Sequence, residues 1–511
     1  MGRKHSSGLA GRRARATRAA NRKRKDMRTH RRSRFLLAAF SVAALTALAA
    51  GMRAQQAGDA PRTGEPTAKA RPSLVLVTID TLRADHLSCY GYFRKTSPAI
   101  DALAADSIVF ERCYATIPHT TPSHASLLTG VLPFEHGITA NFFMASEARQ
   151  RMQALTTSPH FKTYAQILKQ HGWKTGGFVS SATTKKITGL AAGFDAWTEP
   201  SELGRRGTES LEDALQWLRT VGPEPFFLWL HLFDVHGVPE PRDRDLEYGG
   251  AFAEDDALRA HMKELAIPEE FARNERSSAR PTPVINGYDG SIRHVDGLVQ
   301  TLVDELRRLG AWERTAFVLT ADHGEGLGQH EFMGHGLVWG EQLRVPLIVH
   351  VAGSAPERRD DLMSGIDVLP TLLDLLPGFP RDELLAQARG RSVVAADFEP
   401  RPVFSMSPSG KDEYALTATP WKFIHRPKGS DALYHLRDDP HELHDVIGEQ
   451  PRVAAALKQL LFASMKEQRN RHTSLLRGGT MPPISAEEEA KHLEELRKLG
   501  YVDGEAAGDH R

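Results

Sequence analysis

The chain has few of the residues that define several common classes of protein. Its 511 residues include only two cysteines, Cys89 and Cys113. Neither a framework of several disulfides nor a zinc site made of cysteines alone can form from that pair, and we expect both to be small buried apolar side chains. A hydrophobic content of 41% with 25% charged residues is ordinary for a globular protein and excludes wholesale disorder.

The body of the chain also lacks an excess of basic residues. Fourteen of the 65 lysines and arginines lie in residues 1–34, beside a single acidic residue, Asp26. Residues 35–511 therefore hold 51 basic and 63 acidic side chains. Nucleic-acid binding needs a basic face, so we predict no nucleic-acid partner.

The apolar run at residues 35–50 is shorter than the roughly 20 residues that span a bilayer comfortably. It follows Arg31, Arg32 and Arg34 and ends in small residues, which is the layout of a secretory signal. We predict a basic N-terminal tail (1–34), a signal or anchor segment (35–50) and a linker (51–72). A cleaved signal is favoured over a membrane anchor. In both cases the body is exported, to the periplasm or the outer face of the cell membrane.

Short apolar runs alternate with helical patterns from residue 73 onward. Runs of this length and composition are typical of buried parallel strands. Their alternation with helices predicts an α/β fold with a mostly parallel sheet sandwiched by helices. The apolar runs are residues 73–80, 226–231, 315–320 and 345–350, and the helical patterns include 297–309 and 367–376.

The pattern changes after about residue 395. Short strands at 402–406 and 421–425 predict a smaller C-terminal α+β subdomain. We place the larger domain at 73–395, the subdomain at 396–480, and a C-terminal helix and tail at 481–511.

Polar residues end several of the predicted strands, namely Asp80, His231 and Asp322. Ligands of open α/β sheets gather outside the carboxyl ends of the strands. A carboxylate at such a strand end is a natural ligand for a hard metal ion. Asp80 could equally cap the turn that follows it.

Thr120 begins the segment Thr120-Thr-Pro-Ser-His124. Pro122 suits the first turn of a helix, which places Thr120 at a helix N-terminus, where unpaired backbone N–H groups favour an anion. A hydroxyl there, in contact with a metal ion, could ionise and attack phosphorus or sulfur. A plain N-cap fits the same residues equally well.

Histidines gather in the loops after two predicted strands. Asp322 and His323 offer two metal ligands on one tight turn. Five histidines in two loops, beside carboxylates, favour a metal or anion site over separate structural roles. The residues are His323, His330 and His335 in one loop, and His231, Asp234 and His236 in the other.

Together these segments resemble the sulfatase family of the alkaline phosphatase superfamily. The matching segments follow the family's order over residues 72–450, so chance agreement on one short motif is not a serious rival. They are residues 77–91, 120–130, 322–325, 343–348, 366–374 and 432–442.

The resemblance implies an alkaline-phosphatase-like fold and one divalent metal ion held by Asp80, Asp322 and His323. Thr120 would complete the metal's shell as the nucleophile. His236 matches the family histidine that contacts the bound sulfate. His335 stands where sulfatases usually have a lysine, and His124 where they have an arginine.

Three departures from the family pattern affect the chemistry. Sulfatases convert a cysteine or serine to formylglycine, and threonine is not a substrate for that conversion, so Thr120 would act as an alkoxide, as in related phosphodiesterases and phosphotransferases. Thr81 replaces an acidic metal ligand, and His323 stands where many members have asparagine. A nitrogen ligand shifts preference from calcium, which stays possible, towards zinc or manganese.

We therefore predict a metal-dependent hydrolase of sulfate or phosphate esters that uses Thr120, with His124, His236 and His335 stabilising charge on the substrate. The substrate would be a sulfated or phosphorylated glycan, lipid or small molecule. One alternative is a phosphotransferase acting on lipid or glycan headgroups. Another is an anion-binding surface protein that has lost turnover.

Overall fold

The computed structural model describes residues 71–141, 161–236, 248–274, 277–408 and 411–476. The predicted N-terminal tail, the signal segment and the C-terminal helix and tail lie outside the described residues, and so does all but the end of the linker. Within the described ranges, no helix is both long enough and apolar enough to cross a membrane.

An eight-stranded sheet forms the centre of the larger part of the chain, in the order β12-β2-β11-β8-β1-β5-β3-β4. Every residue of β1 and β5 is buried, as continuous apolar runs predict for strands covered on both faces. The strands are β1 (Ser73–Ile79), β2 (Ile108–Tyr114), β3 (Lys174–Val179), β4 (Ala196–Thr198), β5 (Phe226–Leu232), β8 (Thr315–Thr320), β11 (Arg344–His350) and β12 (Glu357–Ser364).

Five of the seven strand pairings in this sheet are parallel, so the prediction of a mostly parallel sheet is confirmed. β11 is the exception, because it runs antiparallel to both of its neighbours, β8 and β2. Its apolar run had predicted a parallel strand. A strand buried on both faces has the same apolar composition in either direction, so composition alone does not report its direction.

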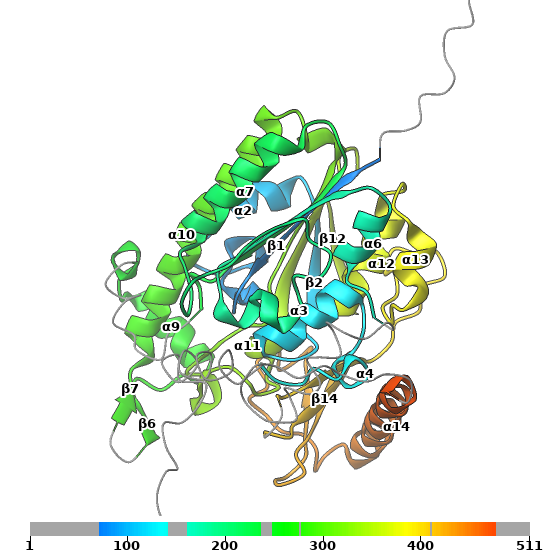
Figure 1. The fold of residues 1–511 in the computed structure, drawn as a ribbon. Helices are drawn as coiled ribbons and strands as arrows, with labels where there is room; N and C mark the ends of the chain where they lie inside the picture. The colour runs from blue at the N-terminus through cyan, green and yellow to red at the C-terminus, as the bar shows by residue number, and fades with distance from the viewer. Residues whose placement is uncertain (1–70, 142–160, 237–247, 275–276, 409–410, 477–511) are drawn as a thin grey trace, which may run out of the picture. The chain divides into compact units, whose positions relative to one another are not determined.

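Helices cover both faces of the sheet, as predicted (Figure 1). The predicted helix at 297–309 is the second half of a longer one, α10, and the helix at 367–376 corresponds to α12. One face carries α2 (Pro98–Ala105), α7 (Gly207–Val221) and α10 (Pro281–Arg308), and the other carries α3 (Thr120–Thr129), α6 (Tyr164–Gln170), α12 (Val368–Leu375) and α13 (Arg381–Ala386).

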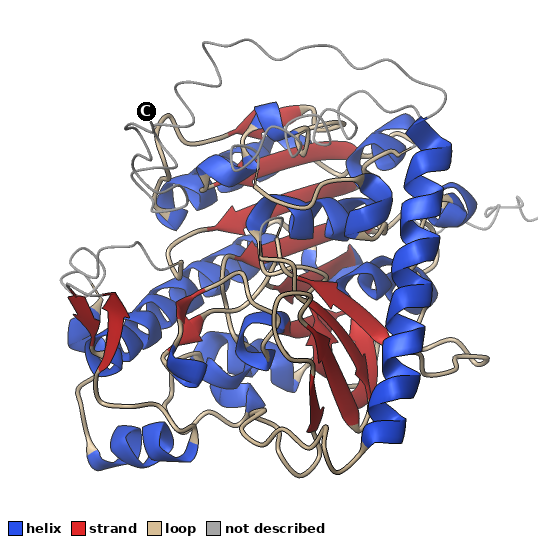
Figure 2. Ribbon diagram, turned by 90° about the horizontal axis from the view of Figure 1, so that it is seen from below, coloured by secondary structure: helices blue, strands red, loops and turns tan. Residues whose placement is uncertain are grey.

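A second, four-stranded antiparallel sheet follows, which confirms the smaller C-terminal α+β unit (Figure 2). It has its own apolar core, to which Leu461 of the long helix and Ile117, from the segment that leads into α3, both belong. The boundaries at 395 and 480 stay predictions. The elements are β13 (Val403–Met406), β14 (Tyr414–Ala418), β15 (Trp421–His425), β16 (Ala432–His435) and α14 (Pro451–Leu476).

Shorter elements complete the fold. Cys113, in β2, is buried as expected, whereas Cys89 is partly exposed, and both are free thiols. The remaining elements are α4 (Pro133–His136), α9 (Asp256–Glu264), α11 (Gly340–Leu343), the hairpin of β6 (Phe271–Asn274) and β7 (Ser277–Ala279), and the hairpin of β9 (Gly326–Leu327) and β10 (Met333–Gly334).

Candidate active site

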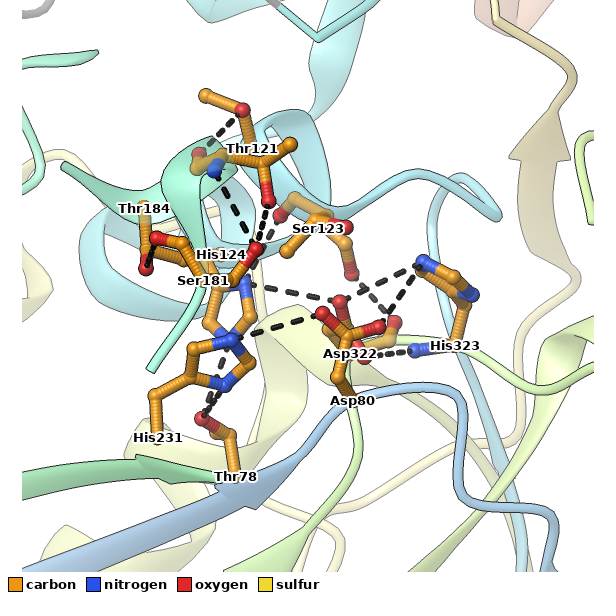
Figure 3. Close-up of polar contacts among 12 residues, drawn as sticks. Thr78, Asp80, Thr121, Ser123, His124, Ser181, Thr184, His231, Asp322 and His323 are labelled. Carbon is orange, nitrogen blue, oxygen red and sulfur yellow. Dashed lines mark hydrogen bonds and ion pairs between the residues drawn. The ribbon is translucent and has the colours of Figure 1, made fainter. Parts of the chain in front are cut away.

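The site lies where three neighbouring parallel strands end. β1 pairs with β8 on one side and with β5 on the other, so their carboxyl ends meet at one edge of the sheet. Asp322 follows β8, Asp80 follows β1, and His231 is the sixth residue of β5. All three side chains are buried and come together in Figure 3. The expectation that these strand ends share one site therefore holds in three dimensions.

Asp80, Asp322 and His323 form a cluster suited to a metal ion. Each offers one ligand atom, and these atoms lie within 4.8 Å of one another. His323 Nε2 is 3.4 Å from Asp322 Oδ2 and 4.0 Å from Asp80 Oδ1. The backbone N–H groups of Thr81 and His323 donate to the other oxygen of Asp322, at 3.2 and 2.9 Å, which leaves Oδ2 directed to the cluster.

The hydrogen bond of the His323 ring fixes which nitrogen can bind a metal. Nδ1 lies 2.9 Å from the carbonyl oxygen of Gly324, which can only accept, so the ring donates from Nδ1. Nε2 then carries a lone pair, the state of a metal-binding histidine whose other nitrogen is held by a carbonyl. Burial lowers the pKa of His323 to about 4, so the ring is neutral near pH 7.

The donor set of the cluster fits a divalent cation. Asp322 Oδ2 and His323 Nε2 are buried and have no hydrogen-bond partner among the described residues. Burial raises the pKa of Asp322, because its charged form has lost contact with water. Unpartnered buried polar atoms are costly, and a cation between two carboxylates and a bare imidazole nitrogen removes that cost.

Thr120 is the first residue of α3 and is fully buried. The N-cap is His119, so Thr120 is not a plain N-cap. Within the part of the chain that the structure describes, Thr120 Oγ1 has no hydrogen-bond partner. A buried hydroxyl normally has one, so this atom is available to a ligand.

The first turn of α3 does not offer the row of free N–H groups that its sequence predicts. The N–H of Thr121 donates to Asn141 Oδ1 at 2.9 Å, and the N–H of Ser123 donates to the carbonyl of His119 at 3.1 Å. Pro122 between them has no N–H. The Thr121 N–H is therefore satisfied by a loop residue and the Ser123 N–H by the first bond of the helix itself, so neither is free to bind an anion.

Ser123 links α3 by a hydrogen bond to the cluster of Asp80, Asp322 and His323. Its hydroxyl donates to the carbonyl oxygen of Asp322 at 2.6 Å (Figure 3). This bond joins the turn that begins with Thr120 to the turn after β8. The turn of Thr120 and the cluster of Asp80, Asp322 and His323 are thus joined by one short hydrogen bond.

Both ring nitrogens of His124 are engaged within the protein. Nδ1 donates to the carbonyl oxygen of Thr120 at 2.8 Å, and Nε2 lies 3.0 Å from Thr78 Oγ1. Burial lowers the pKa of His124 to about 3, although nearby Asp322 opposes this. The ring therefore links the backbone of Thr120, through Nδ1, to the hydroxyl of Thr78, through Nε2.

The hydroxyl of Thr78, near the carboxyl end of β1, connects several site residues that sequence reasoning did not join. It accepts from Trp229 Nε1 at 3.0 Å and also lies 3.3 Å from His231 Nδ1. His231 Nε2 in turn lies 3.5 Å from Asp80 Oδ2. The signal in the sequence was a single polar residue inside an apolar run.

His236 and His335 lie together on the metal cluster. Their Nε2 atoms are 3.4 Å apart, and the ring of His335 lies 4.4 Å from that of His323, between centres. His335 Nδ1 donates to the carbonyl of Pro118 at 3.0 Å. The ring of His119, which the sequence did not single out, lies 5.6 Å from that of His335.

Two predicted members of the histidine clusters lie elsewhere. His330 hydrogen-bonds with Glu341 and with the carbonyl of Glu442, both at 3.1 Å, and stacks on Trp339. Asp234 accepts from the N–H of Gly207. Including His330 in the metal site is a wrong prediction, because both of its ring nitrogens are bonded to other residues. The role of Asp234 stays a prediction.

Comparison with known proteins agrees with this geometry. The Sulfatase family model matches residues 72–379, more than half of the chain. Arylsulfatase K of Mus musculus is 24% identical over 486 residues, which cover 83% of this chain and 84% of that protein.

Two solved structures share the fold. The phosphonate monoester hydrolase of Agrobacterium radiobacter has a TM-score of 0.60 at 18% identity and covers 78% of this chain and 96% of its own. A structure in complex with its substrate D-glucosamine-2-N,6-O-disulfate has a TM-score of 0.58 at 18% identity and covers 78% of this chain and 98% of its own.

Proposed function

Because the chain belongs to the sulfatase family, we propose that it hydrolyses a sulfate or phosphate ester with Thr120 as nucleophile and a divalent cation as cofactor. The observation that carries the proposal is the buried, unpartnered Thr120 hydroxyl on a helix fastened to Asp322. A buried hydroxyl without a partner is costly unless a ligand satisfies it. The intact cluster of Asp80, Asp322 and His323 argues for turnover rather than for a binding protein.

Asp80, Asp322 and His323 would hold the cation, with Thr120 beside them. When bound, it would lower the pKa of the Thr120 hydroxyl and neutralise charge on the ester. The nitrogen of His323 favours zinc or manganese.

The chemistry on the chain's own residues is a double displacement. Thr120 Oγ1 gives its proton to a neutral ring of the His236–His335 pair and bonds to the sulfur or phosphorus atom, while the bond from that atom to the alcohol oxygen breaks. The departing oxygen takes that proton back from the protonated ring. Water then cleaves the threonine ester, and the inorganic anion leaves.

Two residues, His124 and Thr78, position the Thr120 hydroxyl. His124 holds the carbonyl of Thr120, and Thr78 holds His124. These bonds fix the start of α3 against the sheet, so the attacking oxygen needs no rearrangement before reaction. We assign His124 this positioning role, because its nitrogens are already bonded.

The substrate class is an anionic ester. The structural relatives include one named for phosphonate monoesters and one bound to a disulfated glucosamine. Both present a tetrahedral anionic centre. The relative bound to a disulfated glucosamine supports a sulfated sugar as substrate. Thr120, which stands in place of a formylglycine precursor, favours a phosphate ester.

One set of assays tests this function. Metal content is measured, and nitrophenyl sulfate, a nitrophenyl phosphate monoester and a phosphodiester are compared, with Thr120→Ala and with a chelator. We expect one bound metal ion per chain and loss of at least about a thousandfold in kcat for Thr120→Ala, because the covalent step is removed. Full activity of Thr120→Ala on the best substrate would overturn the mechanism. Absence of both metal and turnover would favour a binding protein.

We also propose that the protein is exported, because residues 35–50 have the layout of a signal. N-terminal sequencing of the mature protein from the cell envelope tests this. A mature chain that starts after about residue 50 supports a cleaved signal, and a protein recovered from the cytosol with residues 35–50 intact contradicts export.

A further inference from the structure

Lys411 lies in the turn between β13 and β14 of the C-terminal sheet. Its N–H donates to the carbonyl of Pro408 at 3.2 Å. The turn is closed by Ser407 and Glu413, which exchange two hydrogen bonds of 2.7 and 2.8 Å. Lys411 therefore lies beside the closed base of this turn.

This hairpin packs against the loop that carries His335. A Cβ atom on Gly336 would lie only 3.2 Å from Lys411 Nζ, so the ammonium group rests on the backbone next to His335. Nζ also lies 4.9 Å from the centre of the Phe332 ring. The C-terminal subdomain thus brings a cation to the edge of the active site.

Among the described residues, Lys411 forms no salt bridge with a carboxylate, although the charge of Glu413 acts on it at longer range. Glu413, the nearest carboxylate in sequence apart from Asp412, is held by Arg426 Nε at 2.9 Å, and Asp412 faces Lys428 at 3.4 Å. Lys411 itself is exposed, so a ligand can reach it.

Two of the predicted substrate-binding positions, 124 and 335, carry histidine rings in place of permanently charged side chains. His124 and His335 stand where related sulfatases have an arginine and a lysine. His124 is bonded through both nitrogens, and His335 uses Nδ1 on Pro118. A sulfate or phosphate ester places negative charge on its outer oxygens, which charged donors bind more strongly than neutral ones.

We propose that Lys411 binds the anionic group of the ester and supplies the positive charge absent from positions 124 and 335. The inference rests on the proposed function and deepens it: a residue of the C-terminal subdomain completes the substrate site. It also explains why the hairpin is fixed to the His335 loop. The Lys411 ammonium would donate to an outer oxygen of the sulfate or phosphate.

The test compares Lys411→Met, which keeps the length of the apolar stem, with Lys411→Arg, which keeps the charge. Lys466→Met is the control, because it removes an exposed lysine from α14 of the same subdomain. Two readouts are taken: KM and kcat on the best substrate, and the affinity for inorganic sulfate and inorganic phosphate by calorimetry on the metal-loaded protein.

We expect Lys411→Met to raise KM and weaken anion binding about tenfold, while Lys411→Arg and Lys466→Met stay within about twofold of the wild type. An unchanged affinity and KM for Lys411→Met would overturn the inference. Equal weakening by Lys466→Met would also overturn it, by showing a general effect of net charge. Failure of the proposed function appears separately, as a wild-type protein that cleaves no ester, and the anion-binding readout still decides the role of Lys411.

Discussion

At the scale of single residues, Thr78 shows how one hydroxyl organises the site. Its oxygen lies within 3.3 Å of the Trp229, His124 and His231 nitrogens, all of them buried. Since His124 donates from Nδ1 to Thr120, its neutral ring must accept from Thr78. Buried networks of this kind are stable only when every member is satisfied.

Replacing Thr78 with valine keeps its shape and removes the hydroxyl. We expect Thr78→Val to lower the free energy of unfolding by about 3 kcal/mol, because several buried nitrogens lose their partner. Urea unfolding measures this. Thr78→Ser keeps the hydroxyl and loses one methyl group, and should cost about 1 kcal/mol. Equal losses in the two variants would show that packing, and not the network, dominates.

At the scale of elements, the site depends on strands and a helix that meet from distant parts of the sequence. β1, β5 and β8 present Asp80, His231 and Asp322 because parallel neighbours end at the same edge. The segment before α3 joins the C-terminal subdomain: Ser405 Oγ donates to the carbonyl of Ala115 at 2.7 Å, and Ile117 is part of the second core. The C-terminal subdomain therefore supports the segment that leads into Thr120.

Neighbouring leucines on α14 test this coupling. Leu461 is fully buried in the second core, whereas Leu460 is 52% exposed. Leu461→Ala should lower the free energy of unfolding by about 2–5 kcal/mol through the cavity that it leaves, and should lower the temperature at which activity is lost. Leu460→Ala is the matched control and should stay within about 0.5 kcal/mol of the wild type. If Leu461→Ala lowers the free energy of unfolding but leaves the inactivation temperature unchanged, the C-terminal subdomain does not support the active site.

At the scale of the whole molecule, stability should depend on the metal ion. Asp322 and Asp80 are buried with ligand atoms within 4.8 Å of each other, so without a cation two carboxylates repel in a region shielded from water. Metal at one hundred times its Kd should stabilise the fold by about 2.7 kcal/mol. Asp322→Asn should be more stable than the metal-free wild type and insensitive to metal. Thermal unfolding with chelator and with zinc or manganese measures both, and a metal-induced rise in Asp322→Asn would contradict the assignment.

Buried neutral histidines should make the fold sensitive to acid. His136 lies away from the metal cluster: Nδ1 accepts from the N–H of Ile138, and Nε2 donates to Ser126 Oγ at 3.0 Å. Burial, helped by His472, lowers its pKa to about 3. The unfolded chain takes up the proton near pH 6.5 and the folded chain does so only near pH 3, so His136 lowers stability progressively as the pH falls between these values.

His136→Gln removes this titration. Its free energy of unfolding should fall less steeply than that of the wild type between pH 6 and pH 4, by about 1.4 kcal/mol per pH unit. The variant is expected to be less stable at pH 7, because it loses packing. Urea unfolding across this pH range decides the point, and parallel curves would mean that another group controls the acid response.

Much of the fold was predictable because its strands are continuous apolar runs and its helices have a clear period. Asp80, Asp322 and His323 were predictable because each follows such a run and lies in a segment that resembles the family. The direction of β11 was not, since burial on both faces gives the same composition in either direction. His330 was assigned to the wrong place, because its contacts with Trp339 and Glu442 arise only when distant segments pack.

The sequence by itself determined the order of the strands along the chain, the polar residues at their ends and the threonine at the start of α3. Only the tertiary structure decided which polar atoms are already satisfied. It bonds both nitrogens of His124, leaves Thr120 Oγ1 without a partner among the described residues, and brings Lys411 from another sheet to His335. The physical reason is that hydrogen bonds and charges act over a few ångströms in space, whatever the separation along the chain.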